Sequence, residues 1–214
     1  MHSLSLMRWR AILPRHPALS VVIVMSLQAG PLGASARGDA PPGDAAPIKA
    51  GPVTIPGAEQ FDLRAKSGLD YRIFVASPPS PAPERGHPVI YLTDANFNFP
   101  ILLAAVQKQT LGPLRAVVVG IGYPIDDPKA QRERRGFDLT PPTSEEWKKS
   151  SAGAMGAYKT GGDRQFLDFI EAELKPIVER RYRIDRSHQT LFGHSFGGLF
   201  VLRTLFARPK AFQT

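Results

Sequence analysis

The sequence has no cysteine, and that absence excludes three kinds of chemistry. Without thiols there are no disulfide bonds, no cysteine nucleophile and no thiolate ligands for a metal ion. A hydrophobic core must therefore stabilise the fold. The chain has 214 residues and a hydrophobic content of 43%, which suffices for one sizeable core but hardly for two. We expect one folded domain.

Motifs for nucleic-acid binding are also missing. The formal net charge is +8, but no Lys/Arg-rich helix or RNA-binding motif accompanies it, and part of the excess lies near the N-terminus. A positive charge without such a motif does not indicate a polyanionic partner. We therefore expect no nucleic acid among the partners of this protein.

Residues 1–36 have the pattern of a secretory signal peptide. Three arginines and no acidic residue precede an apolar stretch at residues 18–32, and Ala34-Ser-Ala36 fits a small-x-small cleavage site. The apolar stretch is short for a membrane span, which favours cleavage after Ala36 over a membrane anchor. We expect a periplasmic or secreted protein that keeps no stable membrane span once the leader is removed.

Two further segments follow the leader. Residues 37–52 are rich in Ala, Pro, Gly and Asp, a composition typical of a flexible linker. From residue 53 onward, apolar residues recur with the spacing of strands and helices. We therefore place the folded domain at residues 53–214.

The domain begins with the pattern of an antiparallel hairpin. Residues 59–64 and 71–76 alternate apolar and polar side chains on either side of a turn at Ser67-Gly68. Residues 89–92 and 116–119 are instead continuous apolar runs rich in β-branched residues, as expected of strands buried on both faces of a parallel sheet. The second half of the chain adds a short buried strand at residues 190–192.

Helical patterns separate these strands. Residues 99–110 have the length of a crossover helix, and residues 199–207 form a last helix that stops before a proline. Between them Asp163 is expected to cap a long helix with a kink at Pro176. Its apolar face is formed by Phe166, Phe169, Ile170, Leu174 and Ile177. The alternation of strands and helices predicts an α/β sheet with right-handed crossovers.

The pentapeptide Gly193-His-Ser-Phe-Gly197 joins the last predicted strand to the last helix and matches G-x-S-x-G. In a nucleophile elbow the serine occupies a strained turn with positive φ, and the strand and helix pass too closely for side chains at the two glycines. Ser195 would then stand at the carboxyl edge of the sheet, above the N–H of Phe196 and the positive end of the helix.

Four segments in this order resemble the esterase D type of α/β-hydrolases, and within it the bacterial esterases that open trilactone siderophores. They are Pro88-Val-Ile-Tyr-Leu-Thr-Asp-Ala-Asn96, Val117-Val-Val-Gly-Ile-Gly-Tyr-Pro124, Arg135-Gly-Phe-Asp-Leu-Thr-Pro-Pro142 and Leu191-Phe-Gly-His-Ser-Phe-Gly-Gly198. The resemblance implies an α/β-hydrolase sheet, mostly parallel with an antiparallel N-terminal hairpin. It also implies a serine hydrolase of small-molecule esters with Ser195 as nucleophile, and we expect neither a metal nor an organic cofactor.

The resemblance further implies an oxyanion hole built from two loops. One N–H belongs to Phe196, and the loop after the strand at residues 89–92 supplies the second, which by position is that of Asn96. Ala95 and Phe97 are alternative donors. Asp94, in the same loop, is expected to shape it rather than to take part in the chemistry.

None of the histidines is expected to act as the catalytic base. His194 is next to the serine, and neighbours on a tight elbow point apart, so packing or hydrogen bonding is the expected role. His87 and His188 lie toward the N-terminal ends of their strands, away from Ser195. The base must therefore come from elsewhere.

Residues 123–162 are expected to form a long irregular segment, which in a compact domain is usually functional. A lid with arginines for an anionic substrate and with Trp147 and Tyr158 for aromatic rings would suit a siderophore. The alternative is a solvated surface loop, which we favour for the individual arginines. Arg135 is the best candidate for substrate binding because it lies inside a family-like segment.

The sequence after Ser195 contains no Asp, Glu or His. In α/β-hydrolases the acid and the histidine follow the serine in the chain. We therefore expect these 214 residues to be the N-terminal part of a longer esterase, inactive alone and prone to aggregate through an uncovered sheet edge that exposes apolar surface. The alternatives are a catalytically silent binding protein and an esterase or acyltransferase for another acyl substrate. No pattern indicates an oligomeric state.

Overall fold

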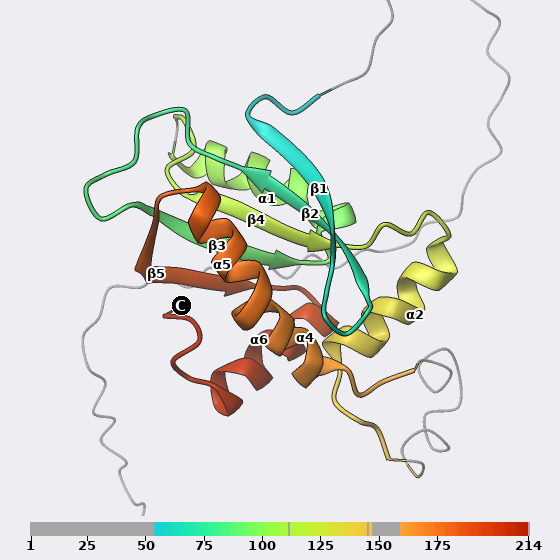
Figure 1. The fold of residues 1–214 in the computed structure, drawn as a ribbon. Coiled ribbons are helices and arrows are strands. Elements are labelled where there is room, and N and C mark those ends of the chain that lie inside the picture. The colour runs from blue at the N-terminus through green and yellow to red at the C-terminus, as the bar shows by residue number, and fades with distance from the viewer. Residues whose placement is uncertain (1–53, 111, 145, 147–158, 214) are drawn as a thin grey trace, which may run out of the picture. The chain divides into compact units, whose positions relative to one another are not determined.

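The fold in Figure 1 comes from a computed structural model, which describes residues 54–110, 112–144, 146 and 159–213. The predicted signal peptide, residues 1–36, and the predicted linker, residues 37–52, lie outside the described residues. No helix within the described ranges is long and apolar enough to cross a membrane.

The described chain contains one mixed sheet of five strands: β1 (Ala58–Arg64), β2 (Asp70–Ala76), β3 (His87–Thr93), β4 (Val117–Gly122) and β5 (Ile184–Phe192). Their order across the sheet is β1-β2-β4-β3-β5, so β1 and β5 form the two edges. The strands β3, β4 and β5 are parallel, and β2 is antiparallel to β4.

The predicted N-terminal hairpin is confirmed. Strands β1 and β2 pair antiparallel, with Ala58 opposite Ala76 and Arg64 opposite Asp70. Arg64 also donates two hydrogen bonds of 2.8 Å to the Asp70 carboxylate. Solvent screens an exposed ion pair of this kind, so the hairpin depends mainly on its contact with the rest of the sheet.

Strand β4 lies inside the sheet, and all six of its residues are buried. Val117, Val119 and Ile121 pack into the apolar layer on one face, while Val118 packs into the layer on the other. Both faces are therefore covered. This explains the continuous apolar run in the sequence and confirms the prediction of a doubly buried strand.

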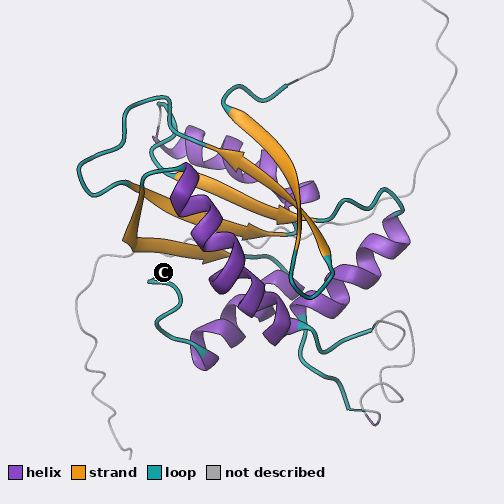
Figure 2. Cartoon of the chain, viewed as in Figure 1, coloured by secondary structure: helices purple, strands orange, loops and turns teal. Residues whose placement is uncertain are grey.

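Helices cover both faces of the sheet (Figure 2). On one face α1 (Ala95–Thr110) contributes Phe99 and Leu103 to a small apolar cluster, and it begins earlier than the predicted residue 99. The larger core lies on the opposite face, under four helical segments: α4 (Asp163–Phe169), η1 (Ile170–Leu174), α5 (Lys175–Arg181) and α6 (Phe196–Ala207).

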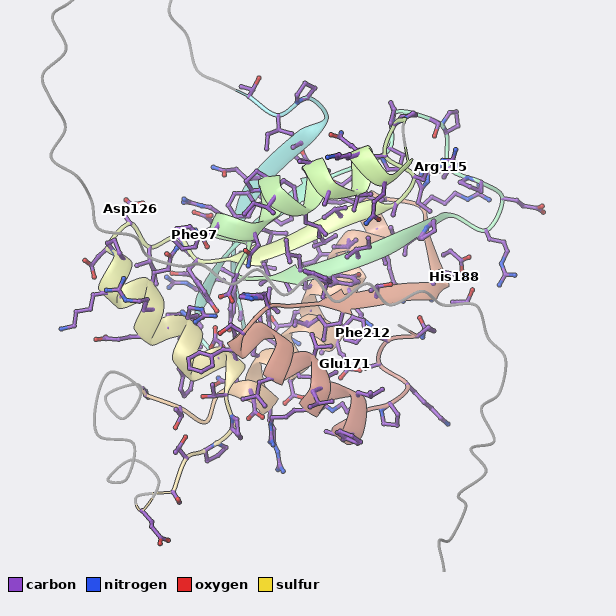
Figure 3. All side chains as sticks on the ribbon, turned by 180° about the vertical axis from the view of Figure 1, so that it is seen from behind. Phe97, Arg115, Asp126, Glu171, His188 and Phe212 are labelled. Atoms are coloured by element: carbon purple, nitrogen blue, oxygen red, sulfur yellow. The ribbon has the colours of Figure 1, made fainter. Side chains whose placement is uncertain are left out.

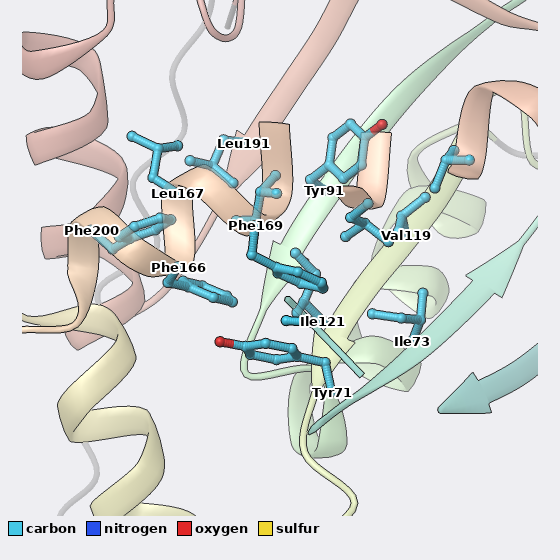
Figure 4. Packing of buried hydrophobic residues seen from close by; sticks show 14 of the residues in the cluster. Tyr71, Ile73, Tyr91, Val119, Ile121, Phe166, Leu167, Phe169, Leu191 and Phe200 are labelled. Carbon is cyan, nitrogen blue, oxygen red and sulfur yellow. The ribbon is translucent and has the colours of Figure 1, made fainter. Parts of the chain in front are cut away.

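The larger core is built around aromatic rings (Figure 4). Tyr71 of β2 stacks on Phe169 with ring centroids 4.2 Å apart, and Phe166 lies 5.4 Å from Tyr71 and 5.1 Å from Phe200. All four side chains are buried. Because Phe200 belongs to α6, this cluster connects the helix after β5 to the interior of the sheet, and such aromatic packing is a large part of core stability.

The long helix predicted after Asp163 is present, but the side chains that face the core in its second half differ from those predicted. Residues 170–174 form a π-helical turn, η1, in which the chain winds more widely than in an α-helix. Beyond this turn Val178 is buried with 1% exposure, whereas Ile177, predicted to be buried, is only half-buried. The wide turn has shifted the buried face by one residue.

Two predicted details of this helix are also corrected. Its N-cap residue is Gly162, and Asp163 instead accepts a hydrogen bond of 2.7 Å from Arg203 of α6. Pro176 lies in the first turn of α5, where the absence of its N–H is tolerated, and the irregularity before it is the π-helical turn.

The segment predicted to be irregular, residues 123–162, contains a helix, α2 (Pro128–Leu139). The Asp127 carboxylate caps this helix by accepting from the Ala130 N–H, and Pro128 occupies its first turn. Both are ordinary signals of a helix start. The prediction was therefore wrong for these residues, while Trp147 and Tyr158 of the proposed lid lie outside the described residues.

Apolar side chains are exposed next to the sheet edge at β5, and most of them belong to α6. At this edge the Gln213 N–H donates to the carbonyl of Gln189 at 2.9 Å. Around it, exposed large hydrophobic residues come from the end of β5 and from α6: Phe192, Leu199, Leu202, Leu205 and Phe206. We call these five residues the α6 patch.

Candidate active site

The strand order opens a crevice at the carboxyl end of the parallel strands. Strand β3 is followed by α1 on one face of the sheet, whereas its neighbour β5 is followed by α6 on the other. Where the connections after two adjacent strands run to opposite faces of the sheet, a crevice opens between them. Open α/β sheets bind ligands in such a crevice. The loops after β3 and β5 therefore mark the expected position of the site.

Ser195 lies in the turn between β5 and α6 with φ 57° and ψ −120°. This is one of two non-glycine residues with positive φ in the described chain, and the other is Asp94, at the end of β3. The predicted strained turn is thus confirmed. Ser195 is exposed, so the turn holds its side chain outside the core.

The two glycines of the pentapeptide provide the space that this turn needs. A Cβ on Gly193 would lie 2.4 Å from the carbonyl carbon of Gly197, and a Cβ on Gly197 would lie 2.3 Å from Oγ1 of Thr93. Neither distance is possible for a real side chain. The spacing in the sequence therefore reflects close contact of β5, α6 and the end of β3.

Two predicted oxyanion donors stand in the first turns of two different helices. Phe196 is the first residue of α6, and Asn96 is the second residue of α1. Within the described chain neither backbone N–H donates to a backbone carbonyl, whereas the alternative donor, Phe97, donates to the carbonyl of Asp94 at 3.3 Å. This leaves Asn96 and Ala95 as candidates for the second donor.

The side chain of Asn96 has a role that the sequence did not reveal. Its Oδ1 accepts from the Tyr123 N–H at 2.8 Å, and its Nδ2 donates to the Tyr123 carbonyl at 2.9 Å. A Cβ on the preceding Gly122 would lie 2.3 Å from Asn96 Oδ1, so the glycine makes this contact possible. The loop after β3 is thereby fixed to the end of β4.

Arg135 of α2 contacts both loops of the site. Its Nε and Nη2 donate to the Asp94 carboxylate at 2.9 and 2.8 Å, a bidentate pair that is mostly buried. The same guanidinium lies 5.0 Å from the centre of the Phe196 ring. The residue predicted to bind substrate is therefore at the site, with its fork of donors directed to Asp94.

A pocket of ≈ 300 Å³ adjoins the serine turn. Arg132 contributes an exposed positive charge to its wall, and no ion pair of the described residues involves this arginine. Because Asp94 balances Arg135, Arg132 makes the pocket net positive. The pocket is lined by Asp94, Asn96, Phe97, Asn98, Tyr123, Pro128, Gln131, Arg132, Arg135 and His194.

A buried ion pair lies beside this pocket. Arg134 donates to the Asp138 carboxylate at 3.0 Å, and its guanidinium lies 4.7 Å from the ring centre of Tyr71 and 5.4 Å from that of Tyr123. Burial raises the pKa of Asp138 to about 6, although the guanidinium of Arg134 opposes that shift. The ion pair lies within α2, and the contacts of Arg134 with the two tyrosine rings hold this helix against the sheet.

One other group combines a serine, a histidine and an aspartate, but its geometry does not suit a catalytic relay. Ser187 Oγ lies 2.6 Å from Asp185 and 3.1 Å from Nδ1 of His188, and the same Nδ1 lies 2.9 Å from Asp185. A relay needs a different ring nitrogen for each partner. These bonds lower the pKa of Asp185 to about 2.

Two of the three histidines in the described ranges lie where the sequence argument placed them, whereas His194, expected to pack or to form a hydrogen bond, is exposed. His188 lies at the opposite end of the sheet from Phe97, which lines the pocket (Figure 3). His87 is the first residue of β3, and His194 lines the pocket. Among the described residues no group of His, Asp or Glu is arranged to hold a metal ion.

A strained serine between a parallel strand and a helix, beside a pocket that a second helix N-terminus also lines, is the arrangement of the α/β-hydrolase fold. The sequence matches the family described as "Putative esterase" over residues 65–214, and the protein belongs to this family.

Curated proteins similar to this chain include siderophore esterases. The chain is 42% identical over 167 residues to the ferri-bacillibactin esterase BesA of Bacillus subtilis, covering 75% of this chain and 57% of that protein. It is 36% identical over 170 residues to the siderophore triacetylfusarinine C esterase of Aspergillus fumigatus, covering 76% and 55%. The chain thus spans little more than half the length of these relatives.

Solved structures with a similar fold are also similar in sequence. The BES protein of Bacillus cereus superposes with a TM-score of 0.66 at 38% identity, over 78% of this chain and 62% of that one. The siderophore hydrolase EstB of Aspergillus nidulans superposes with a TM-score of 0.59 at 34% identity, over 76% and 57%.

Proposed function

We propose that this chain is part of an exported serine esterase, which cleaves ester bonds of siderophores through an acyl-enzyme on Ser195. The observation that carries the proposal is the serine turn: a positive φ at Ser195, with two glycines in contact behind it. Strain of about 1–3 kcal/mol at a non-glycine residue persists only where the surrounding structure imposes it, and it concentrates at functional sites.

The proposed reaction has two steps. Ser195 Oγ attacks the ester carbonyl carbon, its proton passes to a base, and the alkoxide of the substrate leaves as an alcohol after taking up that proton. Water then attacks the acyl-enzyme, releases the carboxylic acid and restores the hydroxyl. In both steps the N–H groups of Phe196 and Asn96 would stabilise the oxyanion, and each such donor contributes a factor of about 10²–10³ in rate.

The part of the chain that the structure describes does not identify a base for Ser195. No Asp, Glu or His follows Ser195 in the 214 residues, and His87 and His188 lie away from the serine turn. We propose that a histidine and an acid outside these residues complete the site, and that the present chain alone is essentially inactive. A second candidate is a silent binding protein that keeps the pocket without the chemistry.

The substrate class is supported by the pocket and by the relatives. The curated relatives act on siderophores, as their names state, and the pocket of this chain carries the positive charge of Arg132 beside the aromatic side chains of Phe97 and Tyr123. Cations and aromatic rings together suit an anionic substrate with aromatic groups. Another ester or an acyl acceptor other than water would be the alternative at the same site.

The test uses a fluorophosphonate probe and a panel of esters that includes a trilactone siderophore. We expect the natural protein to be labelled at Ser195 and to open the trilactone, and Ser195→Ala to abolish both while it stays folded, with a loss of about 10⁶ in kcat. Ser187→Ala is the matched control, since that serine sits at the other end of the sheet. Turnover by the Ser195→Ala variant would refute the mechanism, and trilactone binding without labelling or turnover would favour the binding protein.

A further inference from the structure

Asp94 connects Arg135 to Asn96, one of the two proposed oxyanion donors. Its backbone is in the left-handed region, with φ 56°, and its carbonyl accepts from the N–H groups of Phe97 and Asn98 at 3.3 and 3.2 Å. The backbone conformation of Asp94 and the position of its carbonyl therefore orient the first turn of α1, which contains Asn96. Asp94 is held in turn by the two hydrogen bonds from Arg135.

The side chain of Phe196 connects the same arginine to the other proposed donor, which is the backbone N–H of Phe196 itself. The guanidinium of Arg135 lies 5.0 Å from the centre of the Phe196 ring, within the range of a cation–π contact. The backbone N–H of Phe196 is the proposed oxyanion donor next to Ser195. One planar cation on α2 thus contacts the residues that direct both donors, although these residues lie about 100 positions apart in the chain.

We propose that Arg135 is a positioning residue that sets the separation of the two oxyanion donors, rather than a residue that binds the anionic groups of the substrate. This inference rests on the proposed esterase function. Two of its donors are already engaged with Asp94, whose charge balances its own, so little of its field remains for a substrate anion. The exposed cation in the pocket wall is its neighbour Arg132.

The geometry also explains why lysine would not replace Arg135. A lysine keeps the positive charge but has neither the two-pronged fork for the Asp94 carboxylate nor the flat face that lies on Phe196. If Arg135 only attracted anions, lysine would retain most of the function. If it positions the two loops, lysine should fail almost as badly as glutamine.

The kinetic test compares Arg135→Lys, Arg135→Gln and Arg132→Gln in the natural esterase, with one anionic and one neutral ester. We expect both Arg135 variants to lose about 10²-fold in kcat with both esters and with little change in KM, because an error of about 1 Å in a catalytic group has that effect. Arg132→Gln should instead raise KM for the anionic ester alone. Rescue of kcat by lysine, or a KM effect of Arg135→Gln confined to the anionic ester, would overturn the proposal.

A second measurement needs no turnover. Hydrogen exchange should become faster in Arg135→Lys at both residues 94–98 and residues 195–197, while β4 keeps its protection. Unchanged exchange at either loop would contradict the positioning role. If the wild-type protein is not labelled at Ser195 but the exchange result holds, the esterase proposal fails while the link between the two loops stands.

A double-mutant cycle with Asp94→Asn completes the experiment. Because Asp94 and Arg135 act as one unit in this proposal, the double variant should lose no more kcat than the worse single variant. Independent, additive losses would show that the two residues do not act through their contact.

Discussion

Gly193 and Gly197 lie so close together that a Cβ on the first would stand 2.4 Å from the carbonyl carbon of the second. The atoms that such a Cβ would overlap belong to the backbone of Gly197, so no change of side-chain rotamer can remove the overlap. We therefore expect Gly193→Ala to lower the free energy of unfolding by at least about 2 kcal/mol and to abolish labelling of Ser195.

Gly198→Ala is the control for this substitution. The nearest atom to a Cβ there is the carbonyl oxygen of Gly193 at 3.4 Å, and Gly198 lies inside α6, where alanine is the better helix former. Urea unfolding should show equal or slightly greater stability for this variant. Equal stability of the two alanine variants would mean that the glycines are not in contact.

Ser195 itself should be replaceable by glycine with a gain in stability. Its positive φ costs a side-chain-bearing residue about 1–3 kcal/mol, whereas glycine adopts it freely at some cost in chain entropy. We expect the free energy of unfolding of Ser195→Gly, measured in urea, to be about 1 kcal/mol higher than that of Ser195→Ala. Both lack the hydroxyl, so the comparison isolates the backbone, and a more stable alanine variant would show that the turn is not strained.

The Asn96 side chain should matter for stability as well as for the site. Alanine there leaves the N–H and carbonyl of Tyr123 without their partner, a loss of about 2–3 kcal/mol if water does not replace it. Asn98→Ala, in the same turn of α1, is the matched control and should change the unfolding free energy by less than about 1 kcal/mol. Similar losses for both would assign the effect to the helix and not to the contact.

Asp138 should give the protein a specific pH dependence. Its folded pKa of about 6 lies above the ordinary value of 3.8, so the folded protein keeps a proton that the unfolded chain has lost between these two pH values. Stability from this group is present below about pH 4 and declines as the pH rises toward about 6.

Comparison with Asp138→Asn isolates that contribution. Relative to this variant, the wild-type free energy of unfolding should fall by up to about 3 kcal/mol between pH 4 and pH 7, following a shift of about two pKa units. Unfolding in urea at several pH values measures the difference. A constant difference, or one that grows in favour of the wild type, would show that the buried carboxyl is not protonated near pH 5.

The α6 patch predicts self-association of the 214-residue chain. Phe206 is 78% exposed, and an exposed apolar surface beside an open strand edge promotes aggregation. Leu202→Glu combined with Phe206→Glu should reduce light scattering at equal concentration. Ile101→Glu, a change at a residue that is 66% exposed on α1, is the control and should have little effect.

The parts of the fold that followed from the sequence depend on residues close together in the chain. The hairpin, the apolar run of β4 and the serine turn are each encoded within about twenty residues or fewer, by alternation, by continuous burial and by the spacing of glycines. The helix α2 was missed because its buried side includes Gln131, Gly136 and Asp138, which leave no apolar periodicity.

The contacts that complete the site could not be predicted in this way. Arg135 and Asp94 are 41 positions apart, and Asn96 and Tyr123 are 27 apart. Their pairing depends on the order of β3 and β4 in the sheet and on the placement of α2, which no local pattern specifies. The sequence indicated that the loop after β3 and Arg135 matter, but only the structure shows that they bind each other.

Because of the π-helical turn at Ile170–Leu174, related proteins can differ by one residue in the length of this helical segment. In a regular α-helix, removing one residue rotates everything beyond it by about 100° and turns the buried side chains outward. Here the wide turn already holds one residue more than the helical path requires, so a relative that lacks that residue would continue as a plain α-helix with Val178 still facing the core. An alignment gap of one position between Phe169 and Lys175 would therefore mark a change of helix type and not a change of fold.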